Sequence, residues 1–542
     1  MKKLLLLGDE AIAQAALDAG LSGMYAYPGT PSTEIMEYIQ SSDQSKTQNV
    51  HKEWSSNEKT AIETALGMSY AGKRAMVAMK HVGLNVAADG FINSAITGVN
   101  GGLIVVSADD PSMHSSQNEQ DSRFYGKFAF VPCFEPSNQQ EAYDMVFDAF
   151  DVSEKFKVPV LFRITTRLAH SRASVNTKEI LRQKNLSIPA DPLQFVLLPA
   201  IARKKYKLLL STYESLRYEN RISKYNYFKD GTNRNLGIIT CGIAYNYLLE
   251  NTSEILSDFP VLKISAYPFP KDLIKDITDR CKEILILEEG APVIEESLRG
   301  LLDEGIKVYG RLDGTVPRDG ELNPAIVAKA IGLPVSYGQD IPSLVRMRPP
   351  SFCNGCGHGD MFNSLNEAIK PSGSGHVFSD IGCYTLAALP PYNSINSCVD
   401  MGASVTMAIG AADAGLFPSV AVIGDSTFTH SGMTGLLDAV VKNSHVTIII
   451  SDNSTTGMTG GQKSQATGRL EKICEGIGVK SEHLRMIIPL RKNHDENVRI
   501  MKEEFEYKGV SVIIASRECI QTAAKRIKSE KRTFESSSDI SV

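Results

Sequence analysis

The stretch SVAVIGDSTFTHSGMTGLLDAVVKNSHVTIIISDN, from Ser419 to Asn453, holds two short apolar runs joined by a segment with helical spacing. The runs, Ser419–Gly424 and Val446–Ser451, are rich in β-branched residues and bounded by turn formers, which predicts buried parallel strands. The polar residues after each run then lie at the carboxyl ends of adjacent strands. Ligands bind at that edge of an open α/β sheet, so we expect a site here.

Similar runs alternate with amphipathic helices along most of the chain. Examples are Arg74–Met79, Gly102–Asp110, Val158–Ile164, Leu236–Gly242 and Glu283–Gly290. This alternation predicts an α/β protein with mostly parallel sheets that are covered by helices on both faces.

Two breaks in this pattern predict three domains, at residues 1–180, 236–335 and 350–525. Residues 181–235 are rich in Lys, Arg, Tyr and Asn and are expected to form a linker with some helix. The second break, Gly338–Phe352, contains three prolines. The polar tail, residues 526–542, is expected to be disordered.

The composition favours a cytoplasmic enzyme. The formal charge of −5 over 542 residues gives no electrostatic argument for nucleic-acid binding. The opening MKKLLLL is interrupted by Gly8 and Asp9 too early for a signal peptide and predicts a first strand. No apolar run reaches the roughly 18 residues of a membrane span. The nine cysteines are too scattered for a secreted disulfide framework.

Hard oxygen ligands follow both strands of the opening stretch. Asp425 comes after the sharp turn expected at Gly424, and Asn453 follows the second strand. Their side-chain oxygens predict an octahedral Mg²⁺ site that a phosphate group completes. The carbonyl of Thr455 is a third candidate ligand, and the N–H groups of its loop suit a diphosphate. An ordinary βαβ unit with polar loops is the alternative.

The pair GDS…DN resembles the GDG…NN diphosphate-binding motif of thiamine diphosphate enzymes. Ser426 replaces the second glycine, and Asp452 replaces the first asparagine without removing the metal ligand. Such enzymes also need a glutamate on a pyrimidine-binding domain, and Glu58, at the start of a predicted helix, is the candidate. The alternative for Glu58 is an acid that complements the helix dipole.

A series of further motifs resembles the alpha subunit of indolepyruvate:ferredoxin oxidoreductases over nearly the whole chain. They are YPGTPSTEI (Tyr27–Ile35), MKHVGLNVAADGF (Met79–Phe91), DDPSMHSSQNEQDSR (Asp109–Arg123), EEGAPVIEE (Glu288–Glu296), CNGCGH (Cys353–His358), DIGCYTLAALPP (Asp380–Pro391) and MGAS (Met401–Ser404). The resemblance implies pyrimidine-binding (1–180), transketolase C-terminal-like (236–335) and diphosphate-binding (350–525) domains. The usual C-terminal ferredoxin-like domain is expected to be lacking.

The same resemblance implies an activity and its partners. An aryl 2-oxo acid is decarboxylated oxidatively to an acyl-CoA, with coenzyme A as acceptor of the acyl group and ferredoxin as acceptor of the electrons. A smaller beta subunit and a hetero-oligomer with a homodimeric core are implied too. A non-oxidative 2-oxo acid decarboxylase, and a scaffold subunit without turnover, are the alternatives.

Four cysteines are candidate ligands of a metal centre. Cys353 and Cys356 form a C-x2-C pair, Cys383 follows a predicted strand, and Cys519 lies near the end of the chain. The pattern resembles that of the related pyruvate and 2-oxoacid:ferredoxin oxidoreductases, which implies a [4Fe–4S] cluster. A zinc site with His358, and buried free thiols, are the alternatives.

The resemblance also implies roles for single residues. Glu58 activates the aminopyrimidine ring, and Thr30 lies near the reacting carbon. Two further candidates rest on residue chemistry and not on the resemblance. Arg123 is expected to bind the substrate carboxylate, since a guanidinium group matches carboxylate geometry, or to form a surface ion pair. His81 serves proton transfer or has a structural role. The cofactor-binding set is Glu58, Gly424, Asp425, Ser426, Asn453, Thr455 and Met458, the last beside a roomy apolar pocket.

Overall fold

The computed structural model describes residues 2–252, 258–298, 305–335, 338, 340–346 and 350–528. The chain forms two compact units, Met1–Asp340 and Ile341–Val542. The predicted domains 1–180 and 236–335 both fall in unit 1. Most of the tail predicted to be disordered lies outside the described residues, and the three-domain boundaries stay a prediction.

Unit 1 contains a seven-stranded sheet with the order β12-β6-β7-β5-β4-β2-β3. Its strands are β2 (Gly23–Ala26), β3 (His51–Trp54), β4 (Ala75–Lys80), β5 (Leu103–Asp109), β6 (Cys133–Phe134), β7 (Val160–Thr165) and β12 (Ala266–Tyr267). All neighbouring pairs are parallel except β12 with β6. The expected α/β fold class is confirmed.

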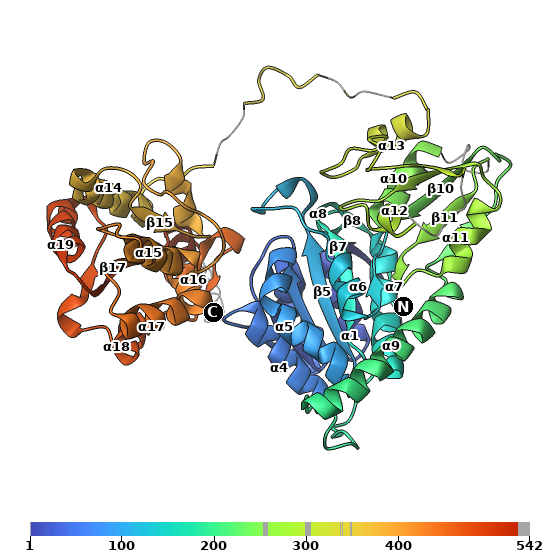
Figure 1. Ribbon diagram of the computed structural model, residues 1–542, viewed down its shortest axis with the longest axis horizontal. Coiled ribbons are helices and arrows are strands. Elements are labelled where there is room, and N and C mark those ends of the chain that lie inside the picture. The colour runs from blue at the N-terminus through green and yellow to red at the C-terminus, as the bar shows by residue number, and fades with distance from the viewer. Residues whose placement is uncertain are drawn as a thin grey trace, which may run out of the picture. The chain divides into compact units, whose positions relative to one another are not determined.

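Helices cover both faces of this sheet (Figure 1). They are α1 (Gly8–Asp18), α2 (Thr33–Ser41), α3 (Asp43–Thr47) and α7 (Gln139–Phe156) on one side, and α4 (Glu58–Tyr70) and α5 (His81–Thr97) on the other. Successive strand residues point to opposite faces, so Met24 packs toward α1 and α7, whereas Tyr25 packs toward α4 and α5. The expected strand MKKLLLL forms β1 (Lys3–Leu7), which pairs antiparallel with β8 (Arg172–Asn176) outside the main sheet.

Local sequence signals account for several helix starts. Asn57, Asn138 and Asn323 precede α4, α7 and α13 (Pro324–Ala330), and each side chain accepts a hydrogen bond from the backbone N–H three residues later. An asparagine N-cap satisfies a backbone donor that the first helical turn leaves free.

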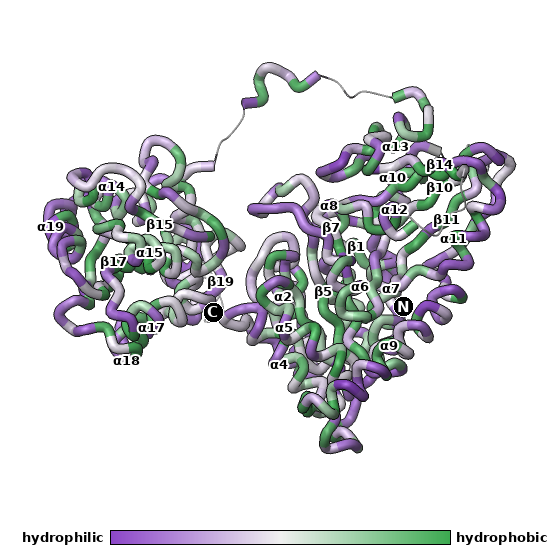
Figure 2. The backbone as a smooth tube through the Cα atoms, in the orientation of Figure 1, coloured by the Kyte–Doolittle hydropathy of each residue, from purple (hydrophilic) through white to green (hydrophobic). Residues whose placement is uncertain are grey.

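A five-stranded sheet with the order β14-β13-β10-β11-β9 completes unit 1. Its strands are β9 (Tyr227–Lys229), β10 (Leu236–Cys241), β11 (Val261–Ile264), β13 (Glu283–Leu287) and β14 (Lys307–Tyr309), with helices α10 (Ile243–Thr252), α11 (Lys271–Thr278) and α12 (Val293–Leu298). The segment expected to be a linker holds the helix α9 (Pro199–Arg221). Figure 2 shows the buried strands β5 and β10 mainly in green and the largely exposed α9 with much purple.

Unit 2 is built on one parallel five-stranded sheet with the order β15-β16-β17-β21-β20. The strands are β15 (Val377–Ser379), β16 (Val420–Gly424), β17 (Val446–Asp452), β20 (Leu484–Ile487) and β21 (Val510–Ser516). The helices α14 (Gly357–Ile369) and α19 (His494–Glu506) cover one face, and α15 (Ala403–Asp413), α17 (Met433–Lys442) and α18 (Leu470–Ile477) cover the other. In the described part of the chain, no helix has the length and apolar character needed to cross a bilayer.

A buried network of charged side chains joins the two sheets of unit 1. Arg163, in β7, is fully buried and donates to Asp109 at 2.6 Å, to Glu135 and to the carbonyl of Glu289 at 2.9 Å. Burial alone would raise the pKa of the nearby Asp121, but Arg123 and Arg163 outweigh it and lower that pKa to about 2. Charges out of contact with water are tolerated only when they are paired in this way.

Arg163→Met should therefore destabilise unit 1 by about 3–5 kcal/mol, because it leaves carboxylates buried without their partner. Trp54, the single tryptophan of the sequence, lies in β3 of the same unit, so its fluorescence during urea unfolding measures the effect. Arg234→Met is the control: Arg234 pairs with Asp230 at 2.6 Å, with side-chain exposures of 51% and 48%. Equal effects of the two substitutions would contradict the structural role of the network.

Candidate functional site

The site expected from the sequence lies at the carboxyl edge of the sheet of unit 2. Strands β16 and β17 pair in parallel with Gly424 opposite Ser451, and β17 and β21 pair with Asp452 opposite Ser516. The segments that follow the three strands therefore leave the sheet side by side. Polar residues from distant parts of the sequence meet there because parallel strands end at one edge.

Asp425 is the most unusual side chain at this edge. It begins the short helix α16 (Asp425–Thr427), is 2% exposed, and its Oδ2 has no hydrogen-bond partner. Burial and the nearby Asp452 raise its pKa to about 7, although a hydrogen bond from Ser464 opposes the shift. A buried carboxylate oxygen without a donor suits a cation. Ser464 was missed by the sequence reasoning, since a lone serine in a loop carries no signal.

The loop after β17 folds back over Asp425. Asn453 accepts a hydrogen bond from the N–H of Thr455 at 3.1 Å, and the hydroxyl groups of Ser426 and Thr456 lie 3.0 Å apart. Thr455 lies in β18 (Thr455–Thr456), which pairs with β19 (Gln462–Lys463).

Asp452, which replaces the first asparagine of the motif, and Met458, a predicted cofactor-binding residue, also belong to this loop. Asp452 accepts from the N–H of Ser454 and the hydroxyl of Ser516, at 3.0 and 2.8 Å, so both of its oxygens serve the fold. Met458 follows in the loop and is 60% exposed.

The structure changes the reason for Gly424. Its φ of −80° is open to any residue, so the expected sharp turn does not require glycine. A Cβ at this position would instead lie 2.6 Å from Cε1 of Tyr384. The buried ring of Tyr384 donates its hydroxyl to Asp380, which also accepts from Ser404 at 2.5 Å at the start of α15. The motifs DIGCYT and MGAS thus meet under the sheet edge.

All four candidate cysteines line one cavity of about 290 Å³, together with Asp452, Asn453 and Gly457 of the diphosphate-type loop. Cys383 Sγ would be 3.0 Å from a Cβ placed on Gly457. Burial, then the thiols of Cys356, Cys519 and Cys353, and then the charge of Asp425 raise the pKa of Cys383 to about 12. The four cysteines therefore share one cavity, which lies beside the candidate magnesium site.

The ligand atoms around the cavity are not preorganised as a tetrahedral zinc site. Tetrahedral zinc, with Zn–S of about 2.3 Å, holds its sulfurs only about 3.8 Å apart. Within the described residues, no three ligand atoms from this set, His358 included, lie within 4.8 Å of one another. Sulfurs that bind one cubane cluster lie wider apart, at about 6–7 Å. His358 does contact Cys356, with Nδ1 3.2 Å from Sγ, and burial lowers its pKa to about 4.

In unit 1, Glu58 opens α4 and is 6% exposed. A Cβ on Gly83 would lie 2.5 Å from Oε1 of Glu58, so the glycine of the MKHVG motif leaves room for this carboxylate. His81, in the same motif, is buried, and its Nε2 lies 3.2 Å from two oxygen atoms of Asn118. Those contacts favour the structural role of His81.

Thr30 lies half-buried in the loop before α2. Its carbonyl accepts a hydrogen bond from Ser115 Oγ at 3.2 Å, and Lys80 Nζ donates to the carbonyl of Ser115 at 2.6 Å. Burial lowers the pKa of Lys80 to about 8, although the charge of Asp110 opposes the shift. Lys80 stands in the quoted motif MKHVG, but only its position beside the Thr30 loop reveals it as a candidate.

Arg123 has a different place from the one expected. Its Nε and Nη2 bind Asp121, its Nη1 binds Glu288 at 3.0 Å, and Nη2 also donates to the carbonyl of Ala291 at 2.9 Å. The side chain is 1% exposed. The expectation that Arg123 binds the substrate carboxylate is therefore corrected, because its donors are saturated by the protein, and the ion pair is buried rather than on the surface.

Two protein families match the two units. The family described as "Pyruvate flavodoxin/ferredoxin oxidoreductase, thiamine diP-bdg" matches residues 14–195. The family described as "Thiamine pyrophosphate enzyme, C-terminal TPP binding domain" matches residues 380–515. The first match contains Thr30 and Glu58, and the second contains Asp425 and Asn453.

Curated indolepyruvate oxidoreductase subunits match almost the whole chain. The indolepyruvate oxidoreductase subunit IorA of Archaeoglobus fulgidus is 39% identical over 549 residues, which are 96% of this chain and 86% of the relative. That of Pyrococcus abyssi is 38% identical over the same shares. The 2-oxoglutarate synthase subunit KorA of Methanocaldococcus jannaschii is 27% identical over 34% of this chain and 52% of its own length.

A solved structure shares the fold. It is the 2-oxoglutarate:ferredoxin oxidoreductase from Magnetococcus marinus with 2-oxoglutarate, coenzyme A and succinyl-CoA bound. The TM-score is 0.51 at 16% identity, over 61% of this chain and 65% of that one.

Gly424→Ala should destabilise unit 2 by about 1–3 kcal/mol, because the new methyl group overlaps the buried ring of Tyr384. Gly410→Ala is the matched control: it lies inside α15 and its Cβ would meet nothing within 4 Å. That change should stabilise the helix by up to about 1 kcal/mol. Urea unfolding followed by far-UV circular dichroism measures both, and equal shifts would rule out the ring contact as the reason for Gly424.

Proposed function

The chain belongs to the indolepyruvate oxidoreductase subunit IorA family of the 2-oxoacid:ferredoxin oxidoreductases, and on that premise we propose that it is the thiamine-binding subunit of an enzyme that oxidatively decarboxylates an aryl 2-oxo acid. The products are an acyl-CoA, CO₂ and reduced ferredoxin. A smaller beta subunit completes the enzyme.

One observation favours an oxidoreductase over a non-oxidative thiamine enzyme. The loop of Asn453 and the thiols of Cys353, Cys356, Cys383 and Cys519 line the same cavity. A non-oxidative decarboxylase requires the loop of Asn453 for its cofactor but does not require the thiols. An oxidoreductase must also remove a pair of electrons, and a cysteine cluster beside the cofactor loop serves that need.

The residues at the sheet edge fit a diphosphate held through Mg²⁺. The unpartnered Oδ2 of Asp425, the side-chain oxygen of Asn453 and the carbonyl of Thr455 would hold the ion, and N–H groups of the loop after Asn453 would hold phosphate oxygens. The small side chain of Ser426 lets the loop approach closely, with the hydroxyl of Thr456 at 3.0 Å from its own. When bound, thiamine diphosphate supplies the electron sink for decarboxylation. Ser464 orients Asp425 by a hydrogen bond.

Glu58 has a separate task in this proposal. Its buried carboxylate, at the start of α4, would form a hydrogen bond with the aminopyrimidine ring of a bound cofactor and so supply the proton that activates the ring. Gly83 keeps the space beside this carboxylate open. By the family resemblance, Thr30 would lie near the reacting carbon.

The four thiols would hold one [4Fe–4S] cluster. They come from the start of α14, the segment after β15 and the segment after β21, and a metal centre would account for their meeting in one cavity. When bound, the cluster supplies a one-electron acceptor. Iron binds thiolates, so cluster binding would release the proton of Cys383. The raised pKa of this thiol applies to the site without the cluster.

We further infer that Lys80 binds the substrate carboxylate, the role that Arg123 cannot fill. Its ammonium group lies at the Thr30 loop and has three N–H donors, of which Ser115 takes one in the structure. A carboxylate near Thr30 would accept a charge-assisted hydrogen bond from the same group.

Thiamine diphosphate with Mg²⁺ should raise the melting temperature of the full chain, because a ligand that binds only the folded state stabilises it. Asp425→Ala should abolish that shift.

Glu58→Gln should keep the thermal shift with thiamine diphosphate yet lose most of the turnover, since it alters activation of the cofactor ring and not diphosphate binding. Differential scanning fluorimetry and a turnover assay separate the two, and no shift in the wild type at saturating cofactor would refute the thiamine site.

Lys80→Met should raise the KM for the 2-oxo acid about 10–100-fold, which corresponds to losing a hydrogen bond to a charged group worth about 1.5–3 kcal/mol. In the wild type, KM should rise as the pH passes through about 8, because Lys80 loses its proton while the substrate keeps its charge. Lys80→Arg should remain insensitive to pH in this range. A flat KM profile in the wild type would contradict the assignment.

Anaerobically purified enzyme should contain iron and sulfide, and should reduce ferredoxin when the aryl 2-oxo acid and coenzyme A are added. Cys383→Ala should lose iron and ferredoxin reduction but keep the thermal shift with thiamine diphosphate. Cys474→Ala is the control, since that thiol is buried in α18 outside the cavity. Release of CO₂ and aldehyde without electron transfer would instead identify a non-oxidative decarboxylase, and no turnover a scaffold subunit.

A further inference from the structure

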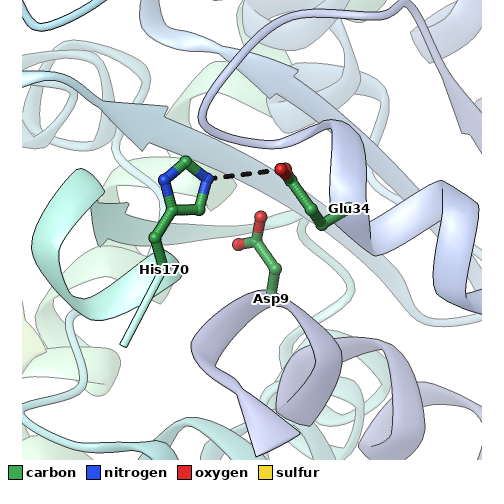
Figure 3. A group of neighbouring side chains, drawn as sticks. All are labelled: Asp9, Glu34 and His170. Atoms are coloured by element: carbon green, nitrogen blue, oxygen red, sulfur yellow. Dashed lines mark ion pairs between the residues drawn. The ribbon is translucent and has the colours of Figure 1, made fainter. Parts of the chain in front are cut away.

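Three potential metal ligands from separate elements meet in unit 1, outside the residues assigned above. They are Asp9 in the first turn of α1, Glu34 in the first turn of α2, and His170 directly after α8 (Thr166–Ala169). One ligand atom from each lies within 4.8 Å of the other two. Figure 3 shows the carboxylate of Asp9 directed toward the other two side chains.

The buried carboxylate of Asp9 is the feature that indicates a bound cation. Its side chain is fully buried, and neither Oδ1 nor Oδ2 has a hydrogen-bond partner. Burying a carboxylate without partners is costly, and the negative charges of Glu34 and Glu10 add to that cost. Burial and these neighbours raise the pKa of Asp9 well above its usual range. No ion pair with Lys or Arg relieves Asp9 within the described residues.

Glu34 and His170 complete a suitable set. His170 Nε2 lies 3.5 Å from Glu34 Oε2, and the two side chains are 34% and 35% exposed. In a tetrahedral zinc site with ligand bonds of about 2.0–2.1 Å, neighbouring ligand atoms are about 3.3 Å apart. Glu34 and His170 are already close to this separation, and an oxygen of Asp9 lies within 4.8 Å of both. The buried Asp9 forms the base of the site, and the other two leave a path from solvent.

We propose that Asp9, Glu34 and His170 form a binding site for a divalent transition-metal ion, best matched by Zn²⁺. One imidazole and two carboxylates suit zinc, and water would occupy the remaining coordination position.

Such a site would link three segments of unit 1. Glu34 lies in the turn that starts α2, where the hydroxyl of Thr33 accepts from the N–H of Gly29 at 3.0 Å. Thr166, in α8, donates to Asp110 at 2.7 Å, and Asp110 also accepts from the N–H of Ser115 at 2.8 Å. The ion would thus connect the segments on both sides of the Thr30 loop.

The test measures the number of zinc ions bound by the full chain after chelator treatment, by equilibrium dialysis and elemental analysis. Asp9→Asn and His170→Gln should each bind one Zn²⁺ fewer than the wild type. The result is the difference in bound zinc between wild type and variant, because the cysteine cavity can also take up zinc in both. His114→Gln is the matched control: His114 contacts Glu321 at 3.4 Å on the surface without a third ligand. Equal stoichiometry in wild type, Asp9→Asn and His170→Gln would overturn the proposal.

Unfolding followed by Trp54 fluorescence gives an independent readout. Without metal, Asp9→Asn should melt at a higher temperature than the wild type, because it removes a buried acid that has no partner. Added Zn²⁺ should then raise the melting temperature of the wild type and of His114→Gln, with little effect on Asp9→Asn. An equal zinc-induced shift in Asp9→Asn would show that the ion binds elsewhere. Neither readout depends on thiamine chemistry.

Discussion

The parallel register of β16, β17 and β21 is the constraint on which the chemistry of unit 2 depends. It places Gly424 opposite Ser451 and Asp452 opposite Ser516, so the segments leading to Asp425, Asn453 and Cys519 start from one sheet edge. The backbone N–H of Cys519 donates to the carbonyl of Asn453 at 3.1 Å, which fixes the thiol beside the diphosphate-type loop. A cofactor loop and a candidate electron acceptor therefore share a cavity because three strands end together.

Buried carboxylates have three different environments in this protein. Asp121 is paired with guanidinium groups, and its pKa falls to about 2. Asp425 keeps one oxygen without a donor, and burial raises its pKa to about 7. Asp9 has no donor on either oxygen. Pairing inside the protein explains the first as part of the fold, whereas the other two suit cations that the fold itself does not provide.

Strand positions, and the place of the GDS…DN pair at adjacent strand ends, could be predicted from the sequence because they rest on local signals. The short β-branched runs form β4, β5, β7, β10 and β13, and the GDS…DN pair lies at adjacent strand ends. Roles that depend on neighbours could not be predicted. Arg123 looked free for a substrate carboxylate, yet Asp121 and Glu288 enclose its guanidinium group. Gly424 looked like a turn residue, yet the ring of Tyr384 explains it.

The sequence by itself determined the α/β class, the family resemblance and the residue types of the thiamine and cysteine sites, because periodicity and motif spacing are written along the chain. Only the tertiary structure decided which distant side chains meet. It brought four thiols from three segments to one cavity, set Lys80 beside the Thr30 loop, and placed Asp9 against Glu34 and His170. Burial and pairing depend on atoms that are remote in sequence, so no local pattern contains them.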